Sequence, residues 1–183
     1  EREQYQMIER ILTLSLPGVP AFFSVFVVNL LAANAAERFR DKVFDEVTIT
    51  RDILYGQNTG YDGTSVPLSL DIYEPSGDTM QHRPVCILAH EGAFLGGSKE
   101  DFVMVKICRE LALRGYVAVS AGYRLGMVSL DSISFVKAAV RGIQDIKSAI
   151  RFVRRNVRSA NTWRIDTNLI FAGGRSAGAV IGT

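Results

Sequence analysis

The sequence contains few of the residues that build metal and disulfide sites. Its 183 residues include two histidines, His82 and His90, and two cysteines, Cys86 and Cys108. Neither cysteine has the spacing of a zinc site, and both lie among apolar neighbours. We therefore expect small, buried thiols and no metal ion. A disulfide stays open as an alternative if the protein is exported.

The sequence also lacks a large excess of either charge. The 21 lysines and arginines against 19 aspartates and glutamates leave a net charge of +2, which is too small to indicate a nucleic-acid partner. The basic residues that cluster have helical spacing, and we interpret them as a solvated helix face: Arg151, Arg154, Arg155 and Arg158. With 48% apolar residues, the chain can form one domain with a sizeable core.

Charged residues are absent from residues 11–36. Within this run, Ala21–Ala33 has the length of a signal-peptide core, and Ala33-Asn34-Ala35 has the small-x-small pattern that signal peptidase accepts. We therefore expect residues 1–35 to be a signal peptide with an upstream extension, cleaved after Ala35, in a secreted or periplasmic protein. An uncleaved membrane anchor and a buried helix of the domain are the alternatives.

The remaining residues, 36–183, alternate between strand-like and helix-like segments. Strands are expected at 43–51, 68–73, 85–89, 116–121 and 168–172, a polar turn at 56–63, and helices at 101–114 and 135–155. The last three strands are continuously apolar and are connected by helices, which indicates parallel pairing with helices on both faces. The first two alternate, which favours an antiparallel edge. The predicted class is α/β, with a mixed but mainly parallel sheet.

The segment Gly174-Arg175-Ser176-Ala177-Gly178 carries the strongest chemical signal. The pattern G-x-S-x-G between a strand and a helix is typical of a nucleophile elbow, whose sharp turn exposes the serine. The backbone N–H of Ala177, the residue after the serine, would face the oxyanion, and the helix N-terminus would favour negative charge there. The pattern alone is common, so the interpretation depends on the flanking strand and helix.

A second signal, His90-Glu91-Gly92-Ala93-Phe94, directly follows the strand at 85–89. Acyl transfer needs backbone N–H groups aimed at the oxyanion of the tetrahedral intermediate. A glycine-rich turn at this place supplies them in many esterases. We interpret His90 as structural, because the catalytic base of such folds follows the nucleophile in the sequence.

Together these motifs resemble the esterase/lipase group of α/β-hydrolases that carries an H-G-G-G/A-F oxyanion motif. Five further segments are similar to that group in order and spacing: Leu70–Pro75, Gly115–Val119, Tyr123–Gly126, Gln144–Asn156 and Ile165–Asn168. The resemblance covers residues 43–183. It implies the α/β-hydrolase fold and a carboxylic-ester hydrolase that works through an acyl-enzyme.

Site residues follow from this resemblance position by position. It implies Ser176 as nucleophile and an oxyanion hole at Gly92, Ala93 and Ala177, with His90, Gly174 and Gly178 supporting the motifs. It implies a small-molecule ester substrate and neither a metal ion nor a cofactor. Membrane contact is expected only if the N-terminal segment is an uncleaved anchor.

Two positions depart from the group's pattern. Glu91 replaces the usual first glycine of the oxyanion motif, and a carboxylate there could oppose the oxyanion charge or change the path of the loop. Arg175 precedes the nucleophile; pairing with Glu91, pairing with an acidic substrate group and a surface role all stay open. Asp145 precedes Ser176, so we expect it to pair with an arginine such as Arg124 and not to serve as the triad acid.

No histidine follows Ser176 in the sequence. A serine hydroxyl is a weak nucleophile until a base takes its proton. The resemblance therefore implies a triad acid and histidine beyond Thr183. Residues 36–183 would then be the N-terminal portion of an α/β-hydrolase domain that is inactive and folds poorly alone. A serine peptidase of the same fold and a catalytically inactive α/β-hydrolase-like binding protein are the alternatives.

Overall fold

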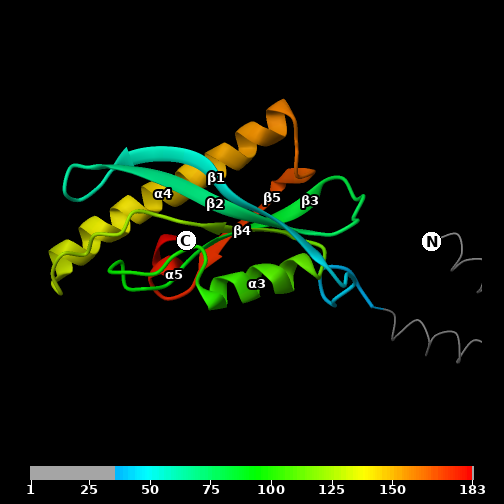
Figure 1. Cartoon of the computed structure of the whole chain (residues 1–183), viewed down its shortest axis with the longest axis horizontal. Helices are drawn as coiled ribbons and strands as arrows, with labels where there is room; N and C mark the ends of the chain where they lie inside the picture. The colour runs from blue at the N-terminus through cyan, green and yellow to red at the C-terminus, as the bar shows by residue number, and fades with distance from the viewer. Residues whose placement is uncertain (1–35, 183) are drawn as a thin grey trace, which may run out of the picture. The chain divides into compact units, whose positions relative to one another are not determined.

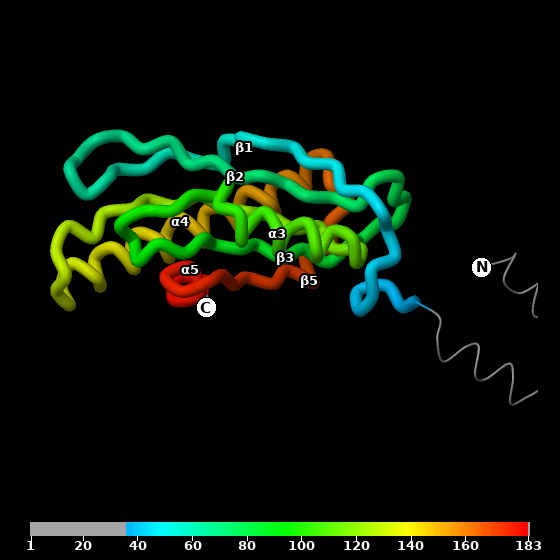
Figure 2. Tube along the Cα trace, turned by 60° about the horizontal axis from the view of Figure 1, so that its bottom comes forward, coloured from blue at the N-terminus to red at the C-terminus, as the bar shows by residue number. Residues whose placement is uncertain are grey.

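Five strands form one mixed sheet. The structure is a computed structural model that describes residues 36–182. In order across the sheet, the strands are β1 (Val47–Thr59), β2 (Ser65–Pro75), β4 (Val117–Ala121), β3 (Arg83–Ala89) and β5 (Ile165–Gly174). The pairs β1–β2 and β2–β4 are antiparallel, whereas β4–β3 and β3–β5 are parallel. Figure 2 shows β1 and β5 at the two edges.

Three helices cover this sheet: α3 (Phe102–Ala112), α4 (Ser132–Ser159) and α5 (Ala177–Ile181) (Figure 1). Successive side chains of a strand point to opposite faces. Along β4, Val117 and Val119 join the core cluster that includes α4 and α5, whereas Ala118 joins the smaller cluster with Cys108 of α3. The two faces are therefore covered by different helices, which confirms the predicted α/β class with a mixed sheet and an antiparallel edge.

Several elements are longer than the sequence pattern predicts. The first strand starts at Val47 and continues to Thr59, so Gly56 lies inside the strand and not in the predicted turn. Pairing with β2 continues across two bulges, and this pairing outweighs the polar, glycine-containing composition. Helix α4 begins three residues before its predicted start, because Asp131 caps it by accepting a hydrogen bond from the Ser134 N–H at 2.8 Å.

The environments of the two cysteines and of the cluster of arginines were also predicted from the sequence. Both cysteines are free thiols; Cys108 is buried and Cys86 is half-buried. Burial raises the pKa of Cys86 to about 11, and burial together with nearby acidic groups raises that of Cys108 to about 12. The prediction of buried thiols is thus confirmed for Cys108, whereas Cys86 keeps part of its surface exposed. The four arginines of the basic cluster are exposed along α4, as predicted.

The compact unit that carries the sheet runs from Arg38 to Thr183. Among the helices of residues 36–182, none is both long enough and apolar enough to cross a bilayer. The predicted signal peptide, residues 1–35, lies outside the described residues.

Candidate active site

Ser176 lies at the sharp turn between β5, which ends at Gly174, and α5, which begins at Ala177. Its backbone has φ 51° and ψ −118°, a conformation that residues with a side chain rarely adopt. Hydrogen bonds fix the turn: the Arg175 N–H donates to the Ala89 carbonyl at 3.2 Å, and the Gly178 N–H donates to the Arg175 carbonyl at 2.9 Å. The expected strand–turn–helix context of this segment is therefore present.

Two glycines of the segment allow very close backbone contact with the end of β3. A Cβ atom added to Gly178 would lie 2.1 Å from the Ala89 carbonyl oxygen, and one added to Gly174 would lie 2.5 Å from the same atom. By contrast, a Cβ on Gly173 would meet only the Leu88 side chain, at 3.8 Å. The elbow thus rests directly on the residue that precedes His90.

The loop after β3 turns sharply beside this elbow. Ala89 is paired with Gly174, so the carboxyl ends of β3 and β5 are neighbours. Gly92, Ala93 and Phe94 have positive φ angles of 121°, 54° and 60°, three in succession. Such a run re-aims consecutive peptide groups over a very short length of chain.

The three backbone N–H groups implied as oxyanion donors belong to Gly92, Ala93 and Ala177. In residues 36–182, none of the three donates a hydrogen bond to another protein group. The Gly92 carbonyl, in contrast, accepts hydrogen bonds from the N–H groups of Leu95 and Gly96, at 2.9 and 3.1 Å. The Gly92 carbonyl therefore takes part in the internal hydrogen bonds of the loop. The N–H groups of Gly92, Ala93 and Ala177 keep no protein acceptor within residues 36–182.

Contacts between His90 and Tyr123 stabilise the start of this loop. The Tyr123 hydroxyl donates to the His90 carbonyl at 2.9 Å, and the two rings stack with centroids 4.2 Å apart. The Nδ1 atom of His90 lies 2.7 Å from the Glu91 carbonyl oxygen, so Nδ1 carries the proton and donates. Burial lowers the pKa of His90, which favours the neutral ring. Neither described histidine hydrogen-bonds to Ser176.

A charge cluster centred on the buried Lys99 and Asp71 lies at the far end of the loop and was not predicted from the sequence. The Lys99 Nζ atom lies 2.8 Å from Asp52, 2.9 Å from Asp71 and 2.9 Å from Glu100. Burial opposes the charged form of Lys99, but the hydrogen bonds to these carboxylates outweigh it and raise the pKa of the lysine. One signal in the sequence could have pointed to the cluster, namely the acidic Asp71 within an apolar strand segment. In the structure this residue is completely buried. The cluster ties the loop to the β1 bulge.

The two positions that depart from the group's pattern contact each other. The Arg175 Nη1 atom lies 2.5 Å from the Glu91 Oε1 atom. The side chains are 52% and 31% exposed, respectively. Of the three roles that the sequence left open for Arg175, the structure shows the ion pair with Glu91.

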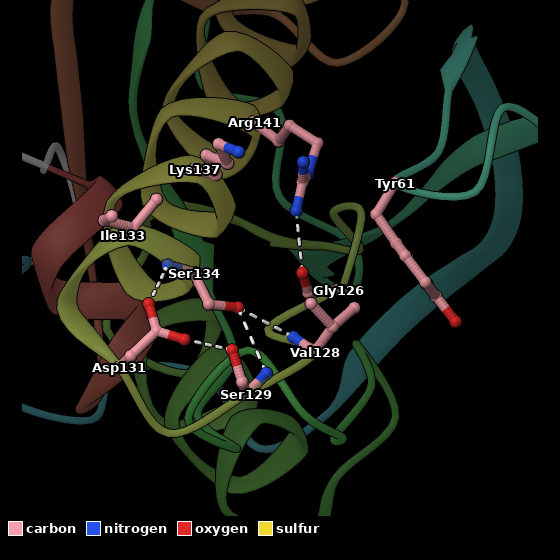
Figure 3. A pocket seen from close by; sticks show the side chains of 9 residues that line it. All are labelled: Tyr61, Gly126, Val128, Ser129, Asp131, Ile133, Ser134, Lys137 and Arg141. Carbon is pink, nitrogen blue, oxygen red and sulfur yellow. Dashed lines mark hydrogen bonds between the residues drawn. The ribbon is translucent and has the colours of Figure 1, made fainter.

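A hollow of about 430 Å³ opens beside the chain that leaves β4 (Figure 3). It is lined by Tyr61, Gly126, Val128, Ser129, Asp131, Ile133, Ser134, Lys137 and Arg141. The Gly126 N–H donates to the Phe94 carbonyl at 2.9 Å, so the hollow adjoins the loop after β3. Within residues 36–182, no three histidines, cysteines or acidic residues are grouped as a metal site.

Curated proteins with similar sequences include two of different kinds. A neuroligin-like protein from Caenorhabditis elegans is 32% identical over 114 residues, which is 61% of this chain and 15% of that protein. A protein from Rhodococcus erythropolis named "Probable N-octanoylanthranilate hydrolase" is 33% identical over 98 residues, which is 52% of this chain and 20% of that protein. The chain thus spans less than a quarter of either relative.

Solved structures with a similar fold include esterases. Esterase 2 from Thermogutta terrifontis, in its apo form, matches 75% of this chain and 44% of its own, with 29% identity and a TM-score of 0.52. A bacterial heroin esterase matches 90% of this chain and 44% of its own at 22% identity, with a TM-score of 0.52, a likeness of fold alone. The model of the BD-FAE family matches residues 70–183, more than half of the chain. The chain therefore belongs to the BD-FAE family of α/β-hydrolase esterases.

Proposed function

We propose that this chain provides the serine nucleophile and the oxyanion-binding amides of a carboxylic-ester hydrolase that works through an acyl-enzyme. The observation that carries the proposal is the backbone of Ser176, held at φ 51° and ψ −118° where β5 meets α5. A strained conformation persists only where surrounding structure imposes it, and such residues cluster at active sites. Here Ser176 lies between Arg175, whose N–H donates to the Ala89 carbonyl, and Gly178, which packs closely against the same residue.

The oxyanion donors in this proposal are the N–H groups of Gly92, Ala93 and Ala177. They come from two loops at the neighbouring carboxyl ends of β3 and β5. None of the three has another acceptor in residues 36–182, so binding an oxyanion breaks no hydrogen bond of the protein. Donors of this kind contribute about a hundredfold to a thousandfold each to acyl transfer.

The reaction then proceeds in two balanced steps. The Ser176 oxygen attacks the ester carbonyl carbon, a histidine from outside residues 36–182 takes the hydroxyl proton, and the carbonyl electron pair moves onto the oxyanion. Collapse of this intermediate expels the alcohol, which receives that proton. Water then attacks the acyl-enzyme in the same way and releases the carboxylic acid and free Ser176.

Labelling of the full-length protein with a fluorophosphonate tests the proposal. We expect one adduct on Ser176, located by peptide mass spectrometry, and hydrolysis of p-nitrophenyl esters. Ser176→Ala should abolish both, whereas Ser148→Ala, a serine on the exposed side of α4, should change neither. A wild-type protein without an adduct would contradict the proposal and favour the inactive binding protein. Support comes from esterase 2 of Thermogutta terrifontis, known phosphorylated by paraoxon and phosphonylated by sarin.

Substrate preference is part of the same test. We expect esters to be cleaved faster than peptides of matched acyl group, which separates an esterase from a serine peptidase of this fold. The Thermogutta esterase has structures with propionate and with butyrate bound. We would therefore test p-nitrophenyl esters from acetate to octanoate, a series that includes these short acyl chains.

For residues 1–35 we propose an export signal that is removed after Ala35. The supporting pattern is the uncharged run that ends in Ala33-Asn34-Ala35. N-terminal sequencing of the mature protein from a secreting host should then begin at Ala36. Recovery of the uncleaved chain in the membrane fraction would instead identify the segment as an anchor.

A further inference from the structure

An ion pair joins the two halves of the candidate active site. Glu91 directly precedes Gly92 in the loop after β3, and Arg175 directly precedes Ser176 in the elbow. Their side chains meet at 2.5 Å, Nη1 to Oε1, although they lie 84 positions apart in the sequence. In residues 36–182, neither side chain forms a second ion pair.

A carboxylate at position 91 poses an electrostatic problem for acyl transfer. The transition state places negative charge at the N–H groups of Gly92 and Ala93, next to Glu91 in the chain. A like charge nearby disfavours that developing charge, and the effect is stronger in a partly buried loop than in water. Glu91 is only 31% exposed, so solvent screens it incompletely.

We propose, on the basis of the proposed function, that Arg175 is a positioning residue that neutralises Glu91 and fastens the oxyanion loop to the nucleophile elbow. The guanidinium cancels the carboxylate charge where the oxyanion forms. The same contact links the residue before Gly92 to the residue before Ser176 through one side-chain ion pair. A glutamate is tolerated in this loop because the residue before the nucleophile is an arginine.

The structure favours this role over direct recognition of an acidic substrate by Arg175. One guanidinium nitrogen is already committed to the Glu91 carboxylate. The pair is electrically neutral as a whole, so it offers an anionic group little net attraction. Direct recognition is nevertheless a defined outcome of the test below.

A double-mutant cycle on the full-length protein measures the coupling. The variants are Arg175→Gln, Glu91→Gln and the double variant, and the readouts are the rate of fluorophosphonate labelling of Ser176 and kcat with a neutral p-nitrophenyl ester. We expect Arg175→Gln alone to lower both rates about fivefold, and about twofold or less when Glu91→Gln is also present. The loss should fall on kcat and not on KM. Arg175→Lys should keep most of the rate.

Two controls keep the result interpretable. Thermal melts of all variants should coincide within a few degrees, because the pair is half-exposed and contributes little to stability. High salt should shrink the loss caused by Arg175→Gln. Equal losses with and without Glu91→Gln would overturn the inference, as would a larger KM confined to acidic esters. Absence of labelling in the wild type would instead overturn the proposed function, and this inference with it.

Discussion

Asp145 of α4 and Arg124 of the chain that follows β4 form a buried ion pair. The Asp145 carboxylate is completely buried and lies 2.8 Å from the Arg124 Nε atom, and it also accepts the backbone N–H of Arg124 at 2.9 Å. The guanidinium donates further to the Thr59 carbonyl at the end of β1, at 2.6 Å. The expected pairing of Asp145 with Arg124 is confirmed. The pair connects α4, the chain that follows β4, and the end of β1.

Removal of one partner of this pair should be strongly destabilising. Asp145→Ala leaves the Arg124 guanidinium buried without its counter-charge, and we expect a loss of about 3 kcal/mol or more in the free energy of unfolding. Denaturant titration measures it. Glu110→Ala is the matched control, because its ion pairs with Lys42 and Arg114 lie at the surface and their loss should cost far less. Equal losses for the two variants would refute this account of the buried pair.

Close backbone contact at the elbow leads to a second expectation. Gly178→Ala places a methyl group 2.1 Å from the Ala89 carbonyl oxygen, so the elbow must move away from β3. We expect a loss of about 1–3 kcal/mol in stability and at least a tenfold slower fluorophosphonate labelling of Ser176. Gly173→Ala, with its nearest contact at 3.8 Å, should label at nearly the wild-type rate. Similar labelling by both alanine variants would argue against a role for this contact.

Backbone strain at Ser176, the proposed nucleophile, should be measurable as a gain in stability when it is released. Ser176 has φ 51°, a region open to glycine but costly for residues with a Cβ. We expect Ser176→Gly to be more stable than Ser176→Ala by about 1 kcal/mol, because alanine removes the hydroxyl but keeps the strain. Both variants lose the hydroxyl group, so a difference in their melting temperatures reports the effect of the backbone conformation. A lower melting temperature for the glycine variant would count against stored strain.

His90, at the start of the loop after β3, should make stability depend on pH. Burial lowers the pKa of His90 below its usual 6.5, so between that lowered value and 6.5 the unfolded chain binds more protons than the folded one. Stability is therefore fully present above pH 6.5 and falls as the pH drops through the folded pKa. Unfolding titrations at pH 7.5 and pH 5.0 should show this loss in the wild type.

Substitution identifies the titrating group. His90→Gln should flatten the dependence between those two pH values, and the exposed His82, changed to Asn, should leave it as in the wild type. Asparagine suits this control because residue 82 has φ 60°. If the slope persists unchanged in His90→Gln, another group is responsible.

Local patterns were sufficient to predict the two turns of the candidate site, but not the interactions that support them. The segment from Gly174 to Gly178 and the turn after residues 85–89 are contiguous, so their spacing carries the geometry. Parallel pairing of the continuous apolar strands then brings Ala89 beside Gly174. The two turns are predictable because each depends on neighbours in the sequence, and the pairing of their strands is predictable because both strands are continuously apolar.

The supporting interactions depend on residues far apart in the chain. Lys99 meets Asp52 only because β1 bulges there, and that bulge arises from pairing with β2. The continuation of β1 through Gly56 has the same origin, since its polar composition resembles a turn. The composition of β1 cannot reveal such features, because they are stabilised by hydrogen bonds to the partner strand β2.

The elbow packs directly against the end of β3, and this contact has a consequence for the order in which parts of the fold form. The Ser176 conformation depends on Ala89 as a support, and Ala89 lies almost half a chain length earlier. Because these two positions are distant in sequence, we expect the Ser176 turn to form only after β3 and β5 have paired. Conversely, a local opening that separates β5 from β3 would remove the support that Ala89 gives to the Ser176 turn.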